Sequence, residues 1–288
     1  MLPPAVQGER FAFDGIEGYA AGRGAPVLLV HSVNAAASVA EVRPLFEHLK
    51  ATRRVYAIDL PGFGRSDRSA RTYTPRLMTD ALHAAVAKIR AERGNVPVDG
   101  VAVSLGCEFL ARAASEQPAQ WRRLALVSPT GFSGSKAWRA APGDTRRVPG
   151  LLSALSVPLW SGPLYNALTR PGVVRYFLEK TWGGKNIDEP MCEYAVLTAR
   201  EPGAKHAPLA FLSGGLFSAD IHAVYESLGQ PVWMSHGVRG DFTDYRGKTL
   251  VEGRPNWRVT VFQTGAMPYF EQPAAFMREL DGFLAGPV

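Results

Sequence analysis

Cysteine is scarce in this sequence of 288 residues, which contains only Cys107 and Cys192. The two lie far apart and no CxxC spacing occurs, so they can form neither a thiolate zinc site nor a disulfide framework. We therefore expect two free, buried thiols. We predict no metal site and no cofactor.

Long hydrophobic runs are also absent. No stretch of about 18 uncharged apolar residues occurs, as a membrane-spanning helix would need. Residues 1–10 lack the basic start and the apolar core of a secretory signal. We predict a cytoplasmic protein with no membrane contact.

Basic residues are numerous but scattered. The net charge of +6 comes from 32 Lys and Arg spread along the chain. Such a distribution is typical of a solvated surface and does not indicate a nucleic-acid partner. The expected partner is a small-molecule substrate or ligand, and no pattern in the sequence indicates the oligomeric state.

Apolar runs and helical patterns alternate along much of the chain, in which 46% of the residues are hydrophobic. Six short, valine-rich runs with flanking turn residues indicate buried strands. Helical patterns follow at 74–91, where Thr74 and Pro75 suit the start of a helix, and at 108–115. Alternation of this kind predicts an α/β fold with a mainly parallel sheet flanked by helices. The six runs are 26–30, 54–59, 98–103, 124–128, 231–235 and 257–262.

The alternation stops between residues 131 and 230. Repeated Pro-Gly, Gly-Pro and Gly-Gly pairs separate short apolar helical pieces there, such as 151–160 and 173–182. The strand pattern resumes at Pro231. We predict a helical cap at 131–230, inserted into a core formed by 1–130 and 231–288. The alternative is an ordinary run of core helices.

Ser104 follows the expected strand 98–103, in the pentapeptide Ala-Val-Ser-Leu-Gly. A sharp turn from strand to helix exposes a serine hydroxyl as a nucleophile, and it needs small residues two before and two after, here Ala102 and Gly106. The backbone N–H of Leu105, at the start of the following helix, would stabilise an oxyanion. We choose Val33, in the loop after the run 26–30, as the second donor.

Five segments together resemble the α/β-hydrolase superfamily, and the resemblance covers nearly the whole chain. It implies an α/β-hydrolase fold with Ser104 as the nucleophile and Asp241 as the acid that orients a base, with Asp244 as an alternative acid. The segments are His31 after the first long strand, DLPGFGRS at 59–66, the turn around Ser104, HGVRGD at 236–241 and GAMPYFEQP at 265–273.

The same resemblance implies a substrate pocket above the serine. It places His31 as the residue that orders the loop beside the nucleophile, with Ser32 next to it where the family often has glycine. Tyr269 is positioned to line the pocket and to donate a hydrogen bond. Trp160 and other apolar residues of the expected cap would form its hydrophobic part.

The family's last motif reads G-H-x-P, and this sequence has Ala266 in the place of the histidine. Glycine, proline and glutamate landmarks on both sides fix this register. A methyl group cannot accept a proton, and loss of the base from a catalytic triad costs about a million-fold in turnover in a serine protease. His236 is one candidate substitute base, and His206 and His222 in the expected cap are two more.

We therefore expect an ester or thioester hydrolase for a small, hydrophobic acyl substrate, with turnover weakened or absent because the base is missing. Two alternatives stay open. In the first, the protein is a non-catalytic pseudohydrolase that binds a ligand. In the second, the sequence is a histidine-to-alanine variant of an active hydrolase, made to trap its substrate.

Overall fold

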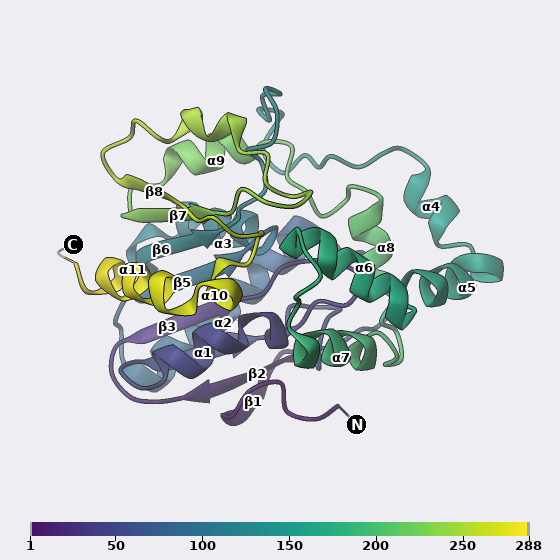
Figure 1. Ribbon diagram of the computed structural model, residues 1–288, viewed down its shortest axis with the longest axis horizontal. Coiled ribbons are helices and arrows are strands. Elements are labelled where there is room, and N and C mark those ends of the chain that lie inside the picture. The colour runs from purple at the N-terminus through teal and green to yellow at the C-terminus, as the bar shows by residue number, and fades with distance from the viewer. Residues whose placement is uncertain (1, 287–288) are drawn as a thin grey trace.

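The computed structural model describes residues 2–286. In this part of the chain, one eight-stranded sheet has the order β1-β2-β4-β3-β5-β6-β7-β8 (Figure 1). β1, β2 and β4 pair in antiparallel fashion, and all other neighbours are parallel. This confirms the predicted mainly parallel sheet. The strands are β1 (Glu9–Phe13), β2 (Ile16–Ala21), β3 (Pro26–Val30), β4 (Arg54–Ile58), β5 (Val98–Val103), β6 (Trp121–Val127), β7 (Val232–His236) and β8 (Trp257–Val261).

The hairpin of β1 and β2 was not predicted from the sequence. β1 lies at the edge of the sheet and none of its residues is buried, so it carries no apolar run. Asp14 and Gly15 join the two strands with φ angles of 45° and 76°. Asp-Gly is a favoured pair for hairpin turns that need positive φ. This dipeptide was the signal that could have revealed the hairpin.

Helices cover both faces of the sheet (Figure 1). The helices that concern the argument are η1 (Val39–Val42), α1 (Arg43–Leu49), α2 (Pro75–Arg93), α3 (Gly106–Glu116), α4 (Leu151–Leu155), α5 (Pro158–Leu168), α6 (Pro171–Trp182), α7 (Glu189–Thr198), α8 (His206–Leu212), α9 (Ile221–Ser227), α10 (Pro268–Glu271) and α11 (Pro273–Ala285). α1 and α11 share one core cluster with Leu29 of β3. α2, α3 and α9 share the other with Leu28.

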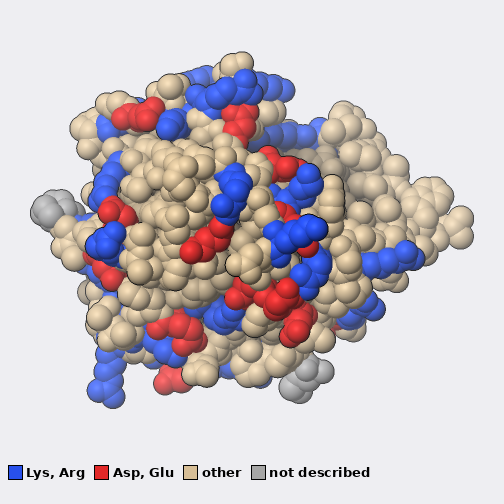
Figure 2. Space-filling model, viewed as in Figure 1, with Lys and Arg blue, Asp and Glu red and all other residues tan. Residues whose placement is uncertain are grey.

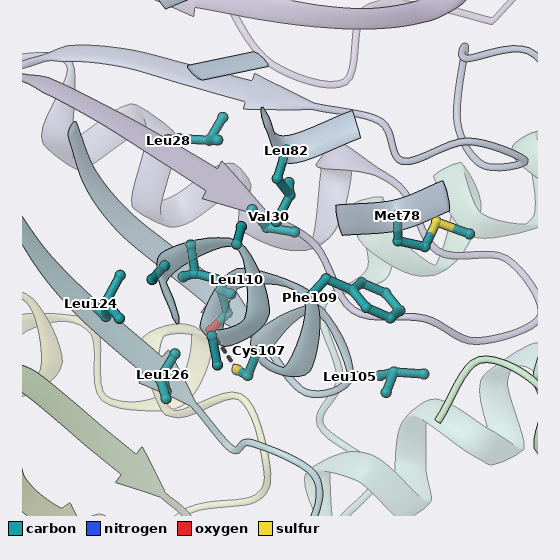
Figure 3. Packing of buried hydrophobic residues seen from close by; sticks show 14 of the residues in the cluster. Leu28, Val30, Met78, Leu82, Leu105, Cys107, Phe109, Leu110, Leu124 and Leu126 are labelled. Carbon is teal, nitrogen blue, oxygen red and sulfur yellow. Dashed lines mark hydrogen bonds between the residues drawn. The ribbon is translucent and has the colours of Figure 1, made fainter. Parts of the chain in front are cut away.

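α3 is held by dense apolar packing where it leaves the sheet. Leu110 lies against Gly100 of β5, and Figure 3 shows Phe109 on the opposite side, toward Met78 of α2. Cys107 is fully buried in the same cluster, and its thiol donates to the carbonyl of Ala102 at 3.2 Å. The start of α3, which follows Ser104, is therefore fixed by the core.

Local sequence explains where two other helices begin. Thr74 caps α2, because its hydroxyl accepts a hydrogen bond from Leu77 N at 3.2 Å, as expected for a threonine before proline. The predicted helix 151–160 is divided into α4 and α5. Val157 precedes Pro158, and a residue before proline is disfavoured in the helical region.

Between β6 and β7 the chain forms α4 to α9. Figure 1 shows α4 to α8 at one side of the sheet, apart from the helices that cover its faces. α9 differs, because it packs against α3. The segment 131–230, expected to be a cap, thus includes one helix of the layer that covers the sheet.

Charged side chains of both signs are interspersed over much of the surface in Figure 2. The tip formed by α4 and α5 is the exception, since residues 148–169 contain no charged side chain. Leu159 and Trp160 are exposed there.

Candidate active site

Ser104 stands at the turn between β5 and α3 with a φ of 53°, which is uncommon for a residue with a side chain. Its N–H donates to Val127 O at 2.8 Å, which ties the turn to β6. Within residues 2–286 the side chain makes no hydrogen bond, and it lines a pocket. The geometry is that of a serine held out of the sheet on a strained turn.

Gly106 allows the helix to start close to the neighbouring loop. A Cβ at this position would lie 2.4 Å from the carbonyl oxygen of His31 and 3.2 Å from Val30 Cγ1. The turn after β5 and the loop after β3 are therefore in contact, and glycine is required for that approach.

Val33 and Leu105, the two predicted oxyanion donors, both line the pocket. Neither backbone N–H has a hydrogen-bond partner among the described residues. Leu105 directly precedes α3, whose N-terminal end favours negative charge. The arrangement suits two N–H groups that stabilise an anion in the pocket.

The loop after β3 is ordered by His31, which is fully buried and does not line the pocket. Its Nδ1–H donates to Ser32 O at 2.5 Å, and its Nε2 accepts from Leu60 N at 3.0 Å. Because both ring nitrogens are engaged, His31 orients the loop and is not free to act as a base. Ser32 itself lines the pocket.

Two residues in this region were missed by sequence reasoning. Glu41 of η1 accepts hydrogen bonds from Ser32 N at 2.9 Å and from Asn34 Nδ2 at 2.6 Å. Asn34 Oδ1 accepts in turn from Ala36 N at 2.8 Å. Both residues line the pocket. The one signal in the sequence is an acidic residue within the apolar stretch Val-Ala-Glu-Val at 39–42.

The pocket has a volume of about 410 Å³ and is largely apolar. Its polar end is formed by the loop after β3, the turn at Ser104 and the residues after β6. Helices α5 to α8 supply the apolar wall, together with Phe217, Phe242 and Met267. The apolar side chains on that wall are Leu168, Val174, Phe177, Leu178, Met191, Ala195, Phe211, Leu212, Phe217 and Phe242.

Ala266 also lines the pocket and is only 7% exposed. Its N–H donates to Thr181 O at 2.9 Å, and its carbonyl accepts from Ser128 Oγ at 2.6 Å. Ser128 has a φ of 49° and lines the pocket as well. The methyl group of Ala266 thus stands on a fixed backbone at the cavity that Ser104 shares.

The structure does not bring Asp241 to the pocket. Its side chain is 56% exposed and lies 3.4 Å from Lys180 Nζ, while its N–H donates to Lys180 O. The alternative acid, Asp244, pairs with Arg246 and accepts from Gly134 N. Neither carboxylate lines the pocket and both are engaged by neighbours, so an orienting acid at either position stays a prediction.

His236 is buried at the end of β7 and does not line the pocket. Nδ1–H donates to Gly237 O at 2.8 Å, and the ring stacks on Tyr245 with 4.1 Å between centroids. Nε2 has no partner within the described chain. Burial lowers the pKa of His236, so the ring is neutral near pH 7. As a substitute base it lacks access to the cavity.

The remaining candidates from the sequence lie elsewhere. Both nitrogens of His222 are engaged, by Trp138 N and Gly131 O, and His206 does not line the pocket. Tyr269 was expected at the pocket, but it is fully buried and its hydroxyl donates to Glu41 O at 2.9 Å. Trp160 is 47% exposed at the surface of α5 and does not reach the cavity.

Across residues 2–286, no three His, Cys, Asp or Glu side chains come together as a potential metal site. None of the helices described combines the length and apolarity needed to cross a membrane.

Comparison with known proteins agrees with this architecture. The alpha/beta hydrolase fold family matches residues 25–181, more than half of the chain. No curated protein sequence matches.

Solved structures are similar over nearly the whole length. One is 2-hydroxy-6-oxo-6-phenylhexa-2,4-dienoate hydrolase from Rhodococcus sp. strain RHA1, with a TM-score of 0.72 and 19% identity over 96% of this chain and 98% of that chain. The meta-cleavage product hydrolase CumD from Pseudomonas fluorescens IP01 has a TM-score of 0.71 and 18% identity, over 96% and 97%. The enol-lactonase from Burkholderia xenovorans LB400 has a TM-score of 0.69 and 16% identity, over 96% and 100%. At these identities the likeness shows the fold.

Proposed function

We propose that this chain, which belongs to the alpha/beta hydrolase fold family, is a serine hydrolase for a small, hydrophobic ester or thioester, with weak turnover. One observation carries the proposal: Ser104, on a turn with a φ of 53°, shares a pocket with the free N–H groups of Val33 and Leu105. A nucleophile and two donors for the oxyanion are the minimum that acyl transfer requires.

The hydrophobic substrate is inferred from the pocket wall. A cavity of about 410 Å³ lined by leucine, valine and phenylalanine side chains would hold a short or medium acyl group. Among the structurally similar proteins, the enol-lactonase is named for action on a lactone, which is a cyclic ester.

Weak turnover is inferred from the absence of histidine among the residues that line the pocket. Without an imidazole beside it, Ser104 keeps its proton at neutral pH and is a poor nucleophile. The same observation favours a second candidate function, a non-catalytic protein that binds an apolar ligand in the cavity.

The decisive experiment restores the imidazole. Ala266→His places a ring at the cavity on a backbone already fixed by Thr181 and Ser128. We expect p-nitrophenyl butyrate hydrolysis to rise by about a hundredfold or more, the usual contribution of a general base. The double variant Ala266→His with Ser104→Ala is the control and should lose the gain.

Labelling with a fluorophosphonate, located by mass spectrometry, gives an independent measurement. We expect slow labelling of Ser104 in the wild type and faster labelling in Ala266→His. If the restored variant is folded but neither hydrolyses the ester nor takes the label, the serine-hydrolase proposal fails. Binding of an apolar carboxylic acid at one molecule per chain would then favour the non-catalytic alternative.

A further inference from the structure

We propose that Glu41 is the proton acceptor for Ser104 in the pocket, an inference that rests on the hydrolase function proposed above. Of the residues that line the cavity, Glu41 is the one with an ionisable acid or base side chain. The rest of the lining consists of apolar residues, serines, threonines and Asn34. A proton released inside this cavity near neutral pH therefore has one side chain that can take it up.

Glu41 is held in a defined position although it is only 3% exposed. Oε2 accepts from Ser32 N at 2.9 Å and Oε1 accepts from Asn34 Nδ2 at 2.6 Å. Tyr269 donates to the backbone carbonyl of the same residue at 2.9 Å, which anchors η1 from α10. Each carboxylate oxygen keeps a second lone pair, and Glu41 is among the residues that line the cavity, so the carboxylate retains the capacity to accept a proton.

No cation neutralises this carboxylate among the residues that line the cavity. Charged groups on nearby elements are engaged with other partners. Asp59 accepts from Val39 N and Arg65 N, and Arg43 of α1 pairs with Asp188 at 2.7 Å. The two bonds that Glu41 accepts both come from neutral donors, Ser32 N and Asn34 Nδ2. The carboxylate is buried without a charged partner in the pocket, as in a proton acceptor and unlike a structural ion pair.

The loops that carry Glu41's partner and the nucleophile lie side by side. β3 and β5 are parallel neighbours, and Val30 is paired with Ala102. Ser32 and Ser104 each come two residues after this pair, so the two serines follow neighbouring strands at the same edge of the sheet. The close approach of Gly106 to His31 shows that the two turns remain in contact. Glu41, whose carboxylate is bonded to Ser32 N, and Ser104 line the same cavity, and the proposed proton path joins the two side chains through one bridging water.

In the proposed reaction, Ser104 Oγ bonds to the carbonyl carbon of the ester while its proton passes through the water to the Glu41 carboxylate. The N–H groups of Val33 and Leu105 hold the oxyanion. When the bond to the alkoxy leaving group breaks, the proton on Glu41 passes to that oxygen. Water then attacks the acyl group on Ser104, gives its proton to Glu41, and the proton returns to Ser104 Oγ as the acid departs. Atoms and charges balance without a further reactant.

The experiment compares Glu41→Gln, Glu41→Ala and the control Glu47→Ala, which removes a carboxylate paired with Lys50 on the surface of α1. Glutamine retains the shape of the side chain and can still accept from Ser32 N through its amide oxygen, but its NH₂ group cannot accept from Asn34 Nδ2. We expect Glu41→Gln to lower Ser104-dependent ester hydrolysis by about a hundredfold or more. Added formate should restore activity to Glu41→Ala but not to Glu41→Gln, because only the alanine variant leaves room for it.

A residue that merely positioned the loop would give a different result. Glu41→Gln would then retain activity within a few-fold of wild type, and formate would not rescue Glu41→Ala. Either finding, with Ser104→Ala inactive and Glu47→Ala normal, would overturn the role of Glu41 and leave the hydrolase function intact. If no variant, Ala266→His included, shows Ser104-dependent hydrolysis or labelling, both proposals fail. Thermal unfolding is measured for each variant to establish that the variant is folded.

Discussion

Gly106→Ala tests whether the close approach of the turn after β5 to the loop after β3 builds the site. The added Cβ would lie 2.4 Å from His31 O, about 1 Å closer than ordinary contact, and 3.2 Å from Val30 Cγ1. His31 cannot easily yield, because its ring is bonded to Ser32 O and to Leu60 N. The strand end and the start of α3 must therefore separate.

We expect this overpacking to cost about 1–3 kcal/mol, reduced by up to about 1 kcal/mol because alanine favours the helix more than glycine does. In a chain of this length, a net loss of about 1–2 kcal/mol lowers Tm by a few degrees. Separation of the two turns also moves the Val33 N–H away from that of Leu105. Loss of one oxyanion donor lowers kcat by about 10²–10³-fold.

The assay is p-nitrophenyl butyrate hydrolysis together with thermal unfolding, with Gly282→Ala as the matched control. Gly282 lies within α11 and its Cβ would meet no atom within 4 Å, so alanine there should stabilise the protein by about 0.5–1 kcal/mol and leave activity unchanged. If Gly106→Ala retained both the Tm and the activity of the wild type, the contact between the two turns would not determine the site.

Three further outcomes are expected. Asp241→Asn should leave ester hydrolysis unchanged, because this carboxylate is exposed away from the pocket; a loss as severe as removal of the nucleophile would contradict this. Glu108→Ala should lower the free energy of unfolding by about 3 kcal/mol or more in urea titrations, since it removes a fully buried carboxylate and leaves the partly buried guanidinium of Arg146 without this partner. Glu116→Ala at the surface should cost about 1 kcal/mol or less. Burial lowers the pKa of His236, so below about pH 6.5 the unfolded chain binds a proton at this residue that the folded protein does not bind, and the free energy of unfolding falls. The stability lost between pH 7 and 5 should therefore be smaller in His236→Phe than in the wild type. An equal loss in the two proteins would refute this.

Much of the framework could be predicted from the sequence because its signals are local. Valine-rich runs with breakers beside them indicated the central strands, which are buried along nearly their whole length. The edge strand β1 was not predicted, because none of its residues is buried and it therefore carries no apolar run. Small residues around Ser104 indicated the turn, and the structure gives that serine a φ of 53°.

The composition of the pocket was decided by contacts between distant segments, which no local pattern encodes. Tyr269 is close in sequence to Ala266 and Met267, which line the pocket, yet its hydroxyl donates to Glu41 O, 228 residues away. Asp241 follows the expected strand, yet the end of α6 holds it at the surface through Lys180. The sequence by itself determined the strands, the strained serine and the absence of a histidine at position 266. Only the tertiary structure decided that Glu41 borders the cavity, because its place depends on how η1 packs against the loop after β3.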